Sequence, residues 1–211
     1  ALVMKTEGNG HLKNVVENVR ALSIPFEEWG EDQITQRLPG YDLRCFAPAK
    51  RMEDPAFGEP GAGRIAEGVF FPTAGYINDP QLASQNIQVA AEAVGCSFLF
   101  NREVVQIPSE GGRVKGVLLA DGTEIKAPVI VNVAGPHSSK VNELAGAVSD
   151  MRITTRALRQ EVAHVPAPEG LDFEGAGLVV SDNDIGVYCR PETGNYVLAG
   201  SEDPPCAAHT A

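Results

Sequence analysis

The sequence predicts a mixed fold of the α+β type, and three observations support this class. Residues 11–22 and 80–94 repeat apolar residues at helical spacing. Short β-rich runs follow one another between residues 96 and 133, and the pair Asp121-Gly122 is typical of a tight hairpin turn. We therefore expect one strand-to-helix unit in the middle of the chain and antiparallel strands on both sides of it.

The first third of the chain alternates between strand and helix signals. Residues 1–6 are expected to form a short strand, and residues 11–22 to form an amphipathic helix. A short helix is expected within residues 27–41, ended by a Pro-Gly pair. Residues 54–63 are a loop by composition, and residues 68–78 resemble a strand.

The clearest predicted helix covers residues 80–94. Asp79 is a suitable N-cap, Pro80 occupies the first helical position, and Gly95 is a natural stop. A second helix is expected at residues 137–145. Strands are expected at 96–100, 103–107, 113–120, 123–127, 129–133, 156–165, 176–181, 185–192 and 196–201.

Composition and charge exclude several classes of function. The 211 residues carry a net charge of −11 without a basic cluster, so we expect neither nucleic acid nor an anionic membrane as a partner. No apolar run reaches the roughly 20 residues that span a bilayer. The scattered cysteines and histidines lack zinc-site spacing, so no metal is expected. Free thiols in the cytoplasm are the expectation for the cysteines, which are Cys45, Cys96, Cys189 and Cys206.

Two glycine patterns are weak candidates for a nucleotide site. The run Gly61-Ala62-Gly63-Arg64-Ile65-Ala66 fits the letters of a dinucleotide motif, but a loop precedes it and a strand follows it. Gly8-Asn9-Gly10 lies between a strand and a helix but lacks the third glycine. A NAD-dependent dehydrogenase would have to use this second pattern, and an ordinary turn is the alternative.

Polar side chains suggest a site for a small carboxylate. Arg190 lies in a strand next to Tyr188, and a strand arginine of this kind can hold a carboxylate by a bidentate pair. Tyr188 and Tyr76 could line such a pocket, whereas a surface salt bridge and ordinary packing are the alternatives. The rival arginines for this role are Arg44, Arg51, Arg156 and Arg159.

The strand 129–133 ends in Ala134-Gly135-Pro136, and His137 and two serines follow. Because side chains of adjacent residues do not face each other on a helix, Ser138 beside His137 is a poor nucleophile–base pair. Capping of the next helix by a serine is the preferred interpretation.

These stretches together resemble a known family. "GVFFPTAGYINDPQLASQNIQVAAEAVGCSFLFNREVVQI", followed by "GRVKGVLLADGTEIKAPVIVNVAGPHSSKVNELAG", is similar to the middle of D-amino-acid oxidase-type flavoproteins, which include glycine oxidase, sarcosine oxidase and dimethylglycine dehydrogenase. "IPFEEWGEDQITQRLPGY" and "GVYCRPETGNYVLAG" are similar to segments of the same family. The resemblance covers nearly the whole chain.

The resemblance implies a discontinuous layout. Residues 1–75 and 147–211 would form a substrate-binding domain with an antiparallel sheet and flanking helices, and residues 76–146 would form the middle piece of a Rossmann-like FAD-binding domain. The family's N-terminal G-x-G-x-x-G motif and its C-terminal flavin segment have no counterpart here. An internal fragment that is inactive alone, and that self-associates through apolar surfaces, is therefore the expectation.

The resemblance also implies which residues meet the cofactor. The backbone of Val104 would contact the adenine of FAD. Ala134, Gly135 and Pro136 would bring the main chain close to the flavin, and His137 takes a position that is often aromatic in relatives.

The implied chemistry is oxidation of a C–N bond in a small amine or amino acid. A hydride passes from the α-carbon to the flavin, and water hydrolyses the imine. Arg190, Tyr188 and Tyr76 would bind the substrate, and no catalytic acid or base is assigned. The alternative function is a non-catalytic small-molecule-binding module derived from the same fold.

Overall fold

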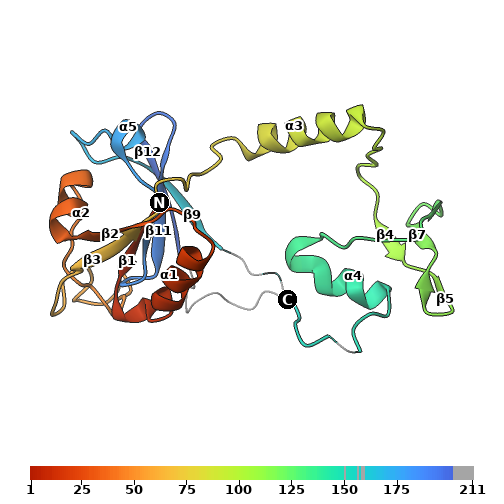
Figure 1. Cartoon of the computed structure of the whole chain (residues 1–211), viewed down its shortest axis with the longest axis horizontal. Coiled ribbons are helices and arrows are strands. Elements are labelled where there is room, and N and C mark those ends of the chain that lie inside the picture. Colours follow the sequence, from red (N-terminus) through yellow and green to blue (C-terminus); the bar gives the residue numbers. More distant parts are fainter. Residues whose placement is uncertain (150, 156, 158–159, 202–211) are drawn as a thin grey trace. The chain divides into compact units, whose positions relative to one another are not determined.

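The computed structural model describes residues 1–149, 151–155, 157 and 160–201, and it divides the chain into two compact units (Figure 1). The first unit joins Ala1–Ala83 to the described residues from Gln160 onward. The second unit covers the described residues between Ser84 and Arg159. The chain therefore leaves the first unit and returns to it after building the second.

A seven-stranded sheet forms the centre of the first unit (Figure 1). Its pairs are antiparallel except for β1 and β10, which run parallel, with Leu2 opposite Val180. The strand order is β2 (Glu27–Gly30), β3 (Glu67–Phe70), β1 (Leu2–Lys5), β10 (Val180–Asp182), β11 (Val187–Glu192), β12 (Tyr196–Ser201) and β9 (Val162–Pro166).

One face of this sheet carries the main core. Alternation along β1 and β10 directs Leu2, Met4 and Val180 to this face, where all three are buried. Helix α2 (Glu31–Arg37) covers it with the fully buried Ile34. The short α5 (Phe173–Ala176) contacts β11 and β12, and the Asp172 side chain caps it by accepting from Gly175 N at 2.8 Å.

The opposite face is covered over β1 and β3 by α1 (Leu12–Ala21). Leu12 and Val16 recur at helical spacing and pack on Val69 of β3. The turn before α1 contains a 3₁₀ helix, η1 (Glu7–Asn9), and the Asn9 side chain donates to the Met4 carbonyl. Burial of one helical stripe thus fixes α1 on half of this face.

The described residues of the second unit form smaller sheets and short helical segments beside one longer helix. Helix α3 (Pro80–Ala93) runs into it, and α4 (Ser138–Leu144) follows the 3₁₀ helix η2 (Gly135–His137). At Gly116 the φ of +151° and the nearby Ile125 carbonyl leave no room for a side chain. The strands are β4 (Val104–Gln106), β5 (Ser109–Glu110), β6 (Arg113–Val114), β7 (Gly116–Leu119) and β8 (Glu124–Lys126).

The mixed fold predicted from the sequence is confirmed, together with both long helices and the hairpin. Asp79 Oδ1 accepts from Leu82 N at 2.8 Å, as expected of an N-cap. Gly122 has a φ of +84° in the turn between β7 and β8. The prediction of a serine cap on α4 is wrong, because the Ser139 hydroxyl instead accepts from Thr155 N at 2.6 Å.

Two predicted strands do not form. Residues 96–100 and 129–133 have no regular secondary structure and lie outside every sheet, although their composition favours strands. A strand needs a neighbour for its backbone groups, and no described segment of the second unit pairs with either run. The predicted strand at 156–165 is shorter, with β9 beginning at Val162; residues 156, 158 and 159 lie outside the described residues.

The prediction of free thiols, apart from their location, agrees with the described residues. Cys45, Cys96 and Cys189 are free thiols, and Cys206 lies outside the described residues. Within the described ranges, no helix combines the length and the apolar character that a membrane crossing requires.

Candidate functional site

The half of the large sheet away from α1 brings together polar and aromatic side chains from three strands. Because side chains alternate along a strand, Tyr188, Arg190 and Glu192 of β11 share one face. Register places Arg190 opposite Leu198 of β12, which lies opposite His164 of β9. The face of β9, β11 and β12 that lies on the same side of the sheet as α1 is called the open face below. It carries Tyr188, Arg190, Leu198 and His164.

Arg190 is the central residue of the open face, and its charge is partly sheltered. Its Nη1 lies 2.9 Å from Glu192 Oε2 and donates to the Pro191 carbonyl at 3.0 Å. Its Cζ lies 4.7 Å from the ring centroid of Tyr76. The structure therefore brings together Arg190 and Tyr76, which lie far apart in the sequence, in a cation–π contact.

Tyr188 and its neighbours give the open face an aromatic lining. A Cβ built on Gly200 would lie 2.5 Å from Tyr188 Oη, so the tyrosine ring occupies the space that glycine leaves. His164 and Tyr196 stack with ring centroids 4.5 Å apart. Tyr188 lies on the same face as Arg190, two positions before it in β11, and it is half-buried whereas Tyr76 is exposed.

The residues expected to meet FAD all lie in the second unit. Val104 begins β4 and pairs with Leu119 of β7. Gly135 has a φ of +56°, with no atom within 4 Å of an added Cβ, and Pro136 and His137 continue the turn as η2. Within the described part of the second unit, no bond or ring contact joins Val104 to this turn.

The turn at residues 134–137 has an accessible main chain. Its backbone is exposed, and the positive φ at Gly135 suits glycine, so a bulky ligand can approach the main chain. Ala134 N donates to Asn132 Oδ1 at 3.1 Å, which holds the start of the turn. The main chain at Gly135 is therefore accessible to a ligand.

Neither glycine pattern forms a cradle for a pyrophosphate. Gly61 and Gly63 are bound to Cys45 through backbone hydrogen bonds, and β3 rather than a helix follows them. Gly8 is packed so closely on the backbone that an added Cβ would lie 2.7 Å from the Asn183 carbonyl. Both patterns serve close packing of the chain on itself.

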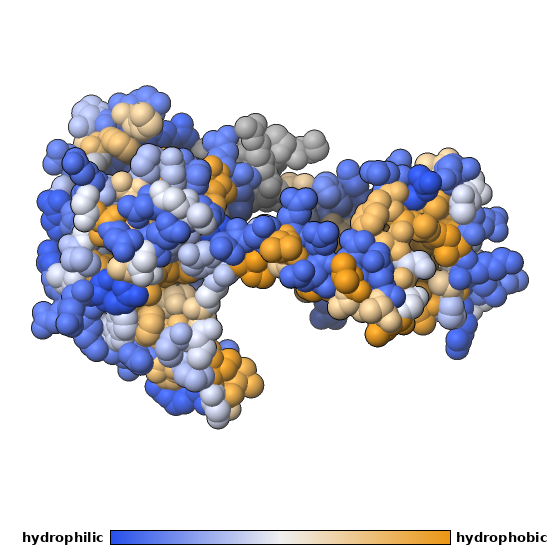
Figure 2. Space-filling model, turned by 90° about the horizontal axis from the view of Figure 1, so that it is seen from above, coloured by the Kyte–Doolittle hydropathy of each residue, from blue (hydrophilic) through white to orange (hydrophobic). Residues whose placement is uncertain are grey.

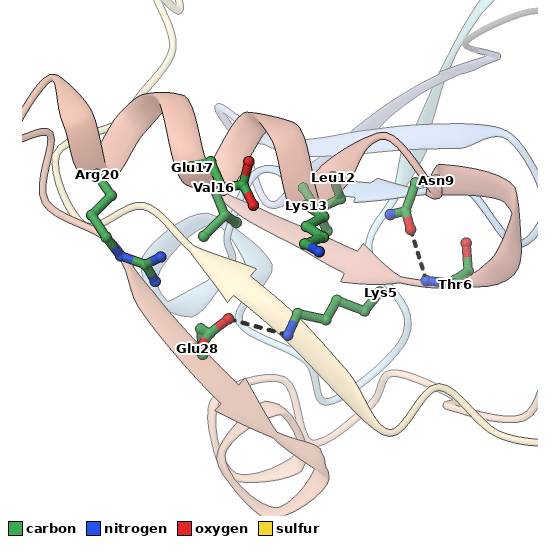
Figure 3. Close-up of a pocket in the computed structure, with 9 residues that line it drawn as sticks. All are labelled: Lys5, Thr6, Asn9, Leu12, Lys13, Val16, Glu17, Arg20 and Glu28. Carbon is green, nitrogen blue, oxygen red and sulfur yellow. Dashed lines mark hydrogen bonds and ion pairs between the residues drawn. The ribbon is translucent and has the colours of Figure 1, made fainter.

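A pocket of about 370 Å³ lies between α1 and strands β1 and β2 (Figure 3). Lys5 Nζ lies 3.3 Å from Glu28 Oε1 and 3.0 Å from Glu67 Oε2, and these bonds raise the pKa of Lys5. Lys13 and Arg20 bring two more positive charges to its wall, as Figure 3 shows. This mixture of paired charges does not point to one ligand class.

A buried carboxylate anchors the loop before β3 to β10. The Tyr41 hydroxyl donates to Asp182 Oδ2, and the Asp184 N–H donates to Oδ1 at 2.9 Å. Burial raises the pKa of Asp182 and also that of the Tyr41 hydroxyl. Every oxygen of this carboxylate is bonded, so we assign it to stability.

Sequence reasoning proposed Arg190, Tyr188 and Tyr76 but did not propose four of their neighbours, which are Glu192, Gly200, His164 and Tyr196. Glu192 could have been found from its spacing of two residues from Arg190 in a strand. Gly200 and the His164–Tyr196 stack depend on the pairing of β9, β11 and β12, which the sequence does not display.

Comparison with protein families gives a match over almost the entire chain. The family model DAO, described as FAD dependent oxidoreductase, matches residues 11–210. No curated protein matches the chain.

Solved structures share the fold at low sequence identity. L-proline dehydrogenase from P. horikoshii is 18% identical with a TM-score of 0.66, covering 96% of this chain and 48% of that protein. Glycine oxidase from Bacillus cereus ATCC 14579 is 15% identical with a TM-score of 0.61, covering 95% and 47%. L-amino acid deaminase from Proteus vulgaris is 13% identical with a TM-score of 0.56, covering 95% and 41%. The chain thus spans about half the length of these proteins.

Proposed function

This chain belongs to the DAO family of FAD-dependent oxidoreductases, and we propose that the complete protein oxidises the C–N bond of a small amine or amino acid. The observation that carries the proposal is Arg190, a sheltered cation on an aromatic sheet face. The matched structures are named for proline, glycine and L-amino acids, which supports an amino-acid substrate.

We propose a division of labour between segments of the chain. Residues 1–75 and 147–211 form the substrate-binding domain, and residues 76–146 belong to the FAD-binding domain. The discontinuous first unit, with its large sheet, supports this layout.

Arg190 is the proposed clamp for the substrate carboxylate. Its Nη1 is bonded to Glu192 and Pro191, whereas Nε and Nη2 form no hydrogen bond with other described residues. Those two N–H groups match the two oxygens of a carboxylate. Tyr188 and Tyr76 would form apolar walls that orient the substrate and exclude water.

The proposed contacts with FAD are the backbone of Val104 and the turn of Ala134, Gly135, Pro136 and His137. When bound, the flavin supplies the acceptor for the hydride from the carbon next to the amine. The open turn at Gly135 supports a close approach of the main chain.

We expect the chain Ala1–Ala211 by itself to bind FAD poorly and to turn over no substrate, because neither glycine pattern forms a pyrophosphate cradle. An FAD titration followed by the visible flavin spectrum and by Trp29 fluorescence measures this. Saturable, stoichiometric binding would contradict the prediction.

A matched pair of variants then tests the turn. Gly135→Ala should weaken any residual flavin binding, whereas Gly146→Ala, at another open glycine with positive φ in the same unit, should not. The proposal that the complete protein oxidises a C–N bond fails if the natural full-length protein purifies without flavin and oxidises no amine.

We also propose that the isolated chain self-associates through the second unit. Ile87, Val94, Val131 and Val133 are all highly exposed, and Figure 2 shows apolar residues gathered on the surface of this unit. Sedimentation velocity should show an apparent mass that rises with protein concentration. The double variant Ile87→Lys, Val94→Lys should show a smaller rise. A monomer at all concentrations would contradict this proposal.

The free thiols of Cys45, Cys96 and Cys189 support a reducing cytoplasm as the proposed location.

A further inference from the structure

We propose that Glu192 determines substrate specificity by competing with the substrate carboxylate for Arg190 and by repelling ligands that carry a second negative charge. This inference rests on the proposed role of Arg190 as the carboxylate clamp. It names the preferred ligand as a small zwitterion, and it predicts discrimination against dicarboxylates.

The first step is that Glu192 and Arg190 form a sheltered pair. Their side chains are 18% and 17% exposed, and Glu192 Oε2 lies 2.9 Å from Arg190 Nη1. The two residues are separated by one position in β11, so both side chains leave the same face of the sheet. Limited exposure reduces the screening of this pair by water.

The second step is that the Glu192 carboxylate is held in place. Its Oε1 accepts from the Thr193 N–H at 3.0 Å, while Oε2 faces Arg190. The Thr193 N–H lowers the pKa of Glu192, and Arg190 and His164 lower it further. Glu192 is therefore charged at neutral pH and points at the clamp.

The charge of Glu192 changes how a ligand binds at Arg190. A monocarboxylate on the free edge of Arg190 meets a guanidinium whose charge Glu192 already offsets, so its binding is weakened. The ammonium of an amino acid gains attraction to Glu192, whereas a second carboxylate meets repulsion. The open face therefore favours a ligand with one negative and one positive charge.

Acetate, succinate and neutral acetamide are the probes for this idea. Their affinities for the full chain Ala1–Ala211 would be measured by NMR titration of the backbone amide signals, which are present in the wild type and in every variant. Glu192→Gln removes the charge and keeps an oxygen that can accept from Thr193. Glu169→Gln removes one charge from an exposed loop position and serves as the matched control.

We expect Glu192→Gln to bind acetate about tenfold more tightly and to gain more for succinate than for acetate, with no change for acetamide. Glu169→Gln should behave as the wild type, and Arg190→Met should abolish acetate binding. Trp29 fluorescence verifies that each variant is folded.

The outcomes separate the inference from the proposed function. Equal acetate affinity in the wild type and Glu192→Gln, with loss in Arg190→Met, would overturn the role of Glu192 and retain the clamp. Acetate binding that survives Arg190→Met, or that is absent from the wild type and Glu192→Gln alike, would overturn the clamp itself.

Discussion

The two units of this chain bury their apolar residues to very different extents. In the first unit, Leu2, Met4 and Ile34 are fully buried between the sheet and α2. In the second unit, α3 has no buried residue, and Ile107 and Leu119 are the buried large apolar side chains among the described residues. Both units contain regular elements, so local sequence preference alone does not explain the difference.

The comparison shows that helices and strands depend on their surroundings in different ways. Helix α3 satisfies its own backbone hydrogen bonds and has an aspartate cap, so it forms although its surface is exposed. Val129, Val131 and Val133 lie in a β-rich run, yet Val133 is 86% exposed and the run joins no sheet. A strand requires a partner, and the first unit supplies partners from both ends of the chain.

The largest expected effect on stability comes from a substitution in the core of the first unit. Ile34→Ala should lower the free energy of unfolding of the first unit by about 2–5 kcal/mol, because it leaves a cavity under the sheet. Ile87→Ala in α3 should change stability by less than about 0.5 kcal/mol, since Ile87 is 72% exposed. Denaturant unfolding followed by Trp29, the single tryptophan, measures the first unit.

A similar loss for both variants would show that α3 is packed against apolar residues in solution. The Ile87 variant would then be compared at two protein concentrations, because self-association buries the same side chain and depends on concentration.

A smaller effect is expected at the polar anchor of the first unit. Tyr41→Phe removes the hydroxyl that bonds the buried Asp182, which should cost about 1–3 kcal/mol. Burial already raises the folded-state pKa of Asp182, so stability falls as the pH rises from the ordinary aspartate pKa through the raised value. Losing the hydroxyl raises this pKa further. Tyr41→Phe should therefore lower the free energy of unfolding by more at pH 8 than at pH 5.

Denaturant unfolding of both proteins at the two pH values checks this sign. Tyr196→Phe, in β12 of the same sheet, is the matched control, because the Tyr196 hydroxyl forms no hydrogen bond with a described residue. A Tyr41→Phe penalty that is independent of pH would contradict the assignment of Asp182 as the responsible group.

Much of the local structure could be predicted from particular residues. Asp79, Pro80 and Gly95 define the ends of α3, and Asp121-Gly122 defines the β7–β8 turn, because these signals act through the backbone of neighbouring residues. The parallel pairing of β1 with β10 could not be predicted, since their paired residues lie 178 positions apart, as Leu2 and Val180 show.

The candidate site also combines features that the sequence predicts with features that depend on strand pairing. The sequence by itself determined that Arg190 and Tyr188 lie in one strand with side chains on one face, and that Gly135 follows a β-rich run. Only the tertiary structure decided that Tyr76 covers Arg190 and that Gly200 makes room for Tyr188. The reason is physical: alternation within a strand is a property of local geometry, whereas contacts between distant segments depend on which strands pair and which faces are buried.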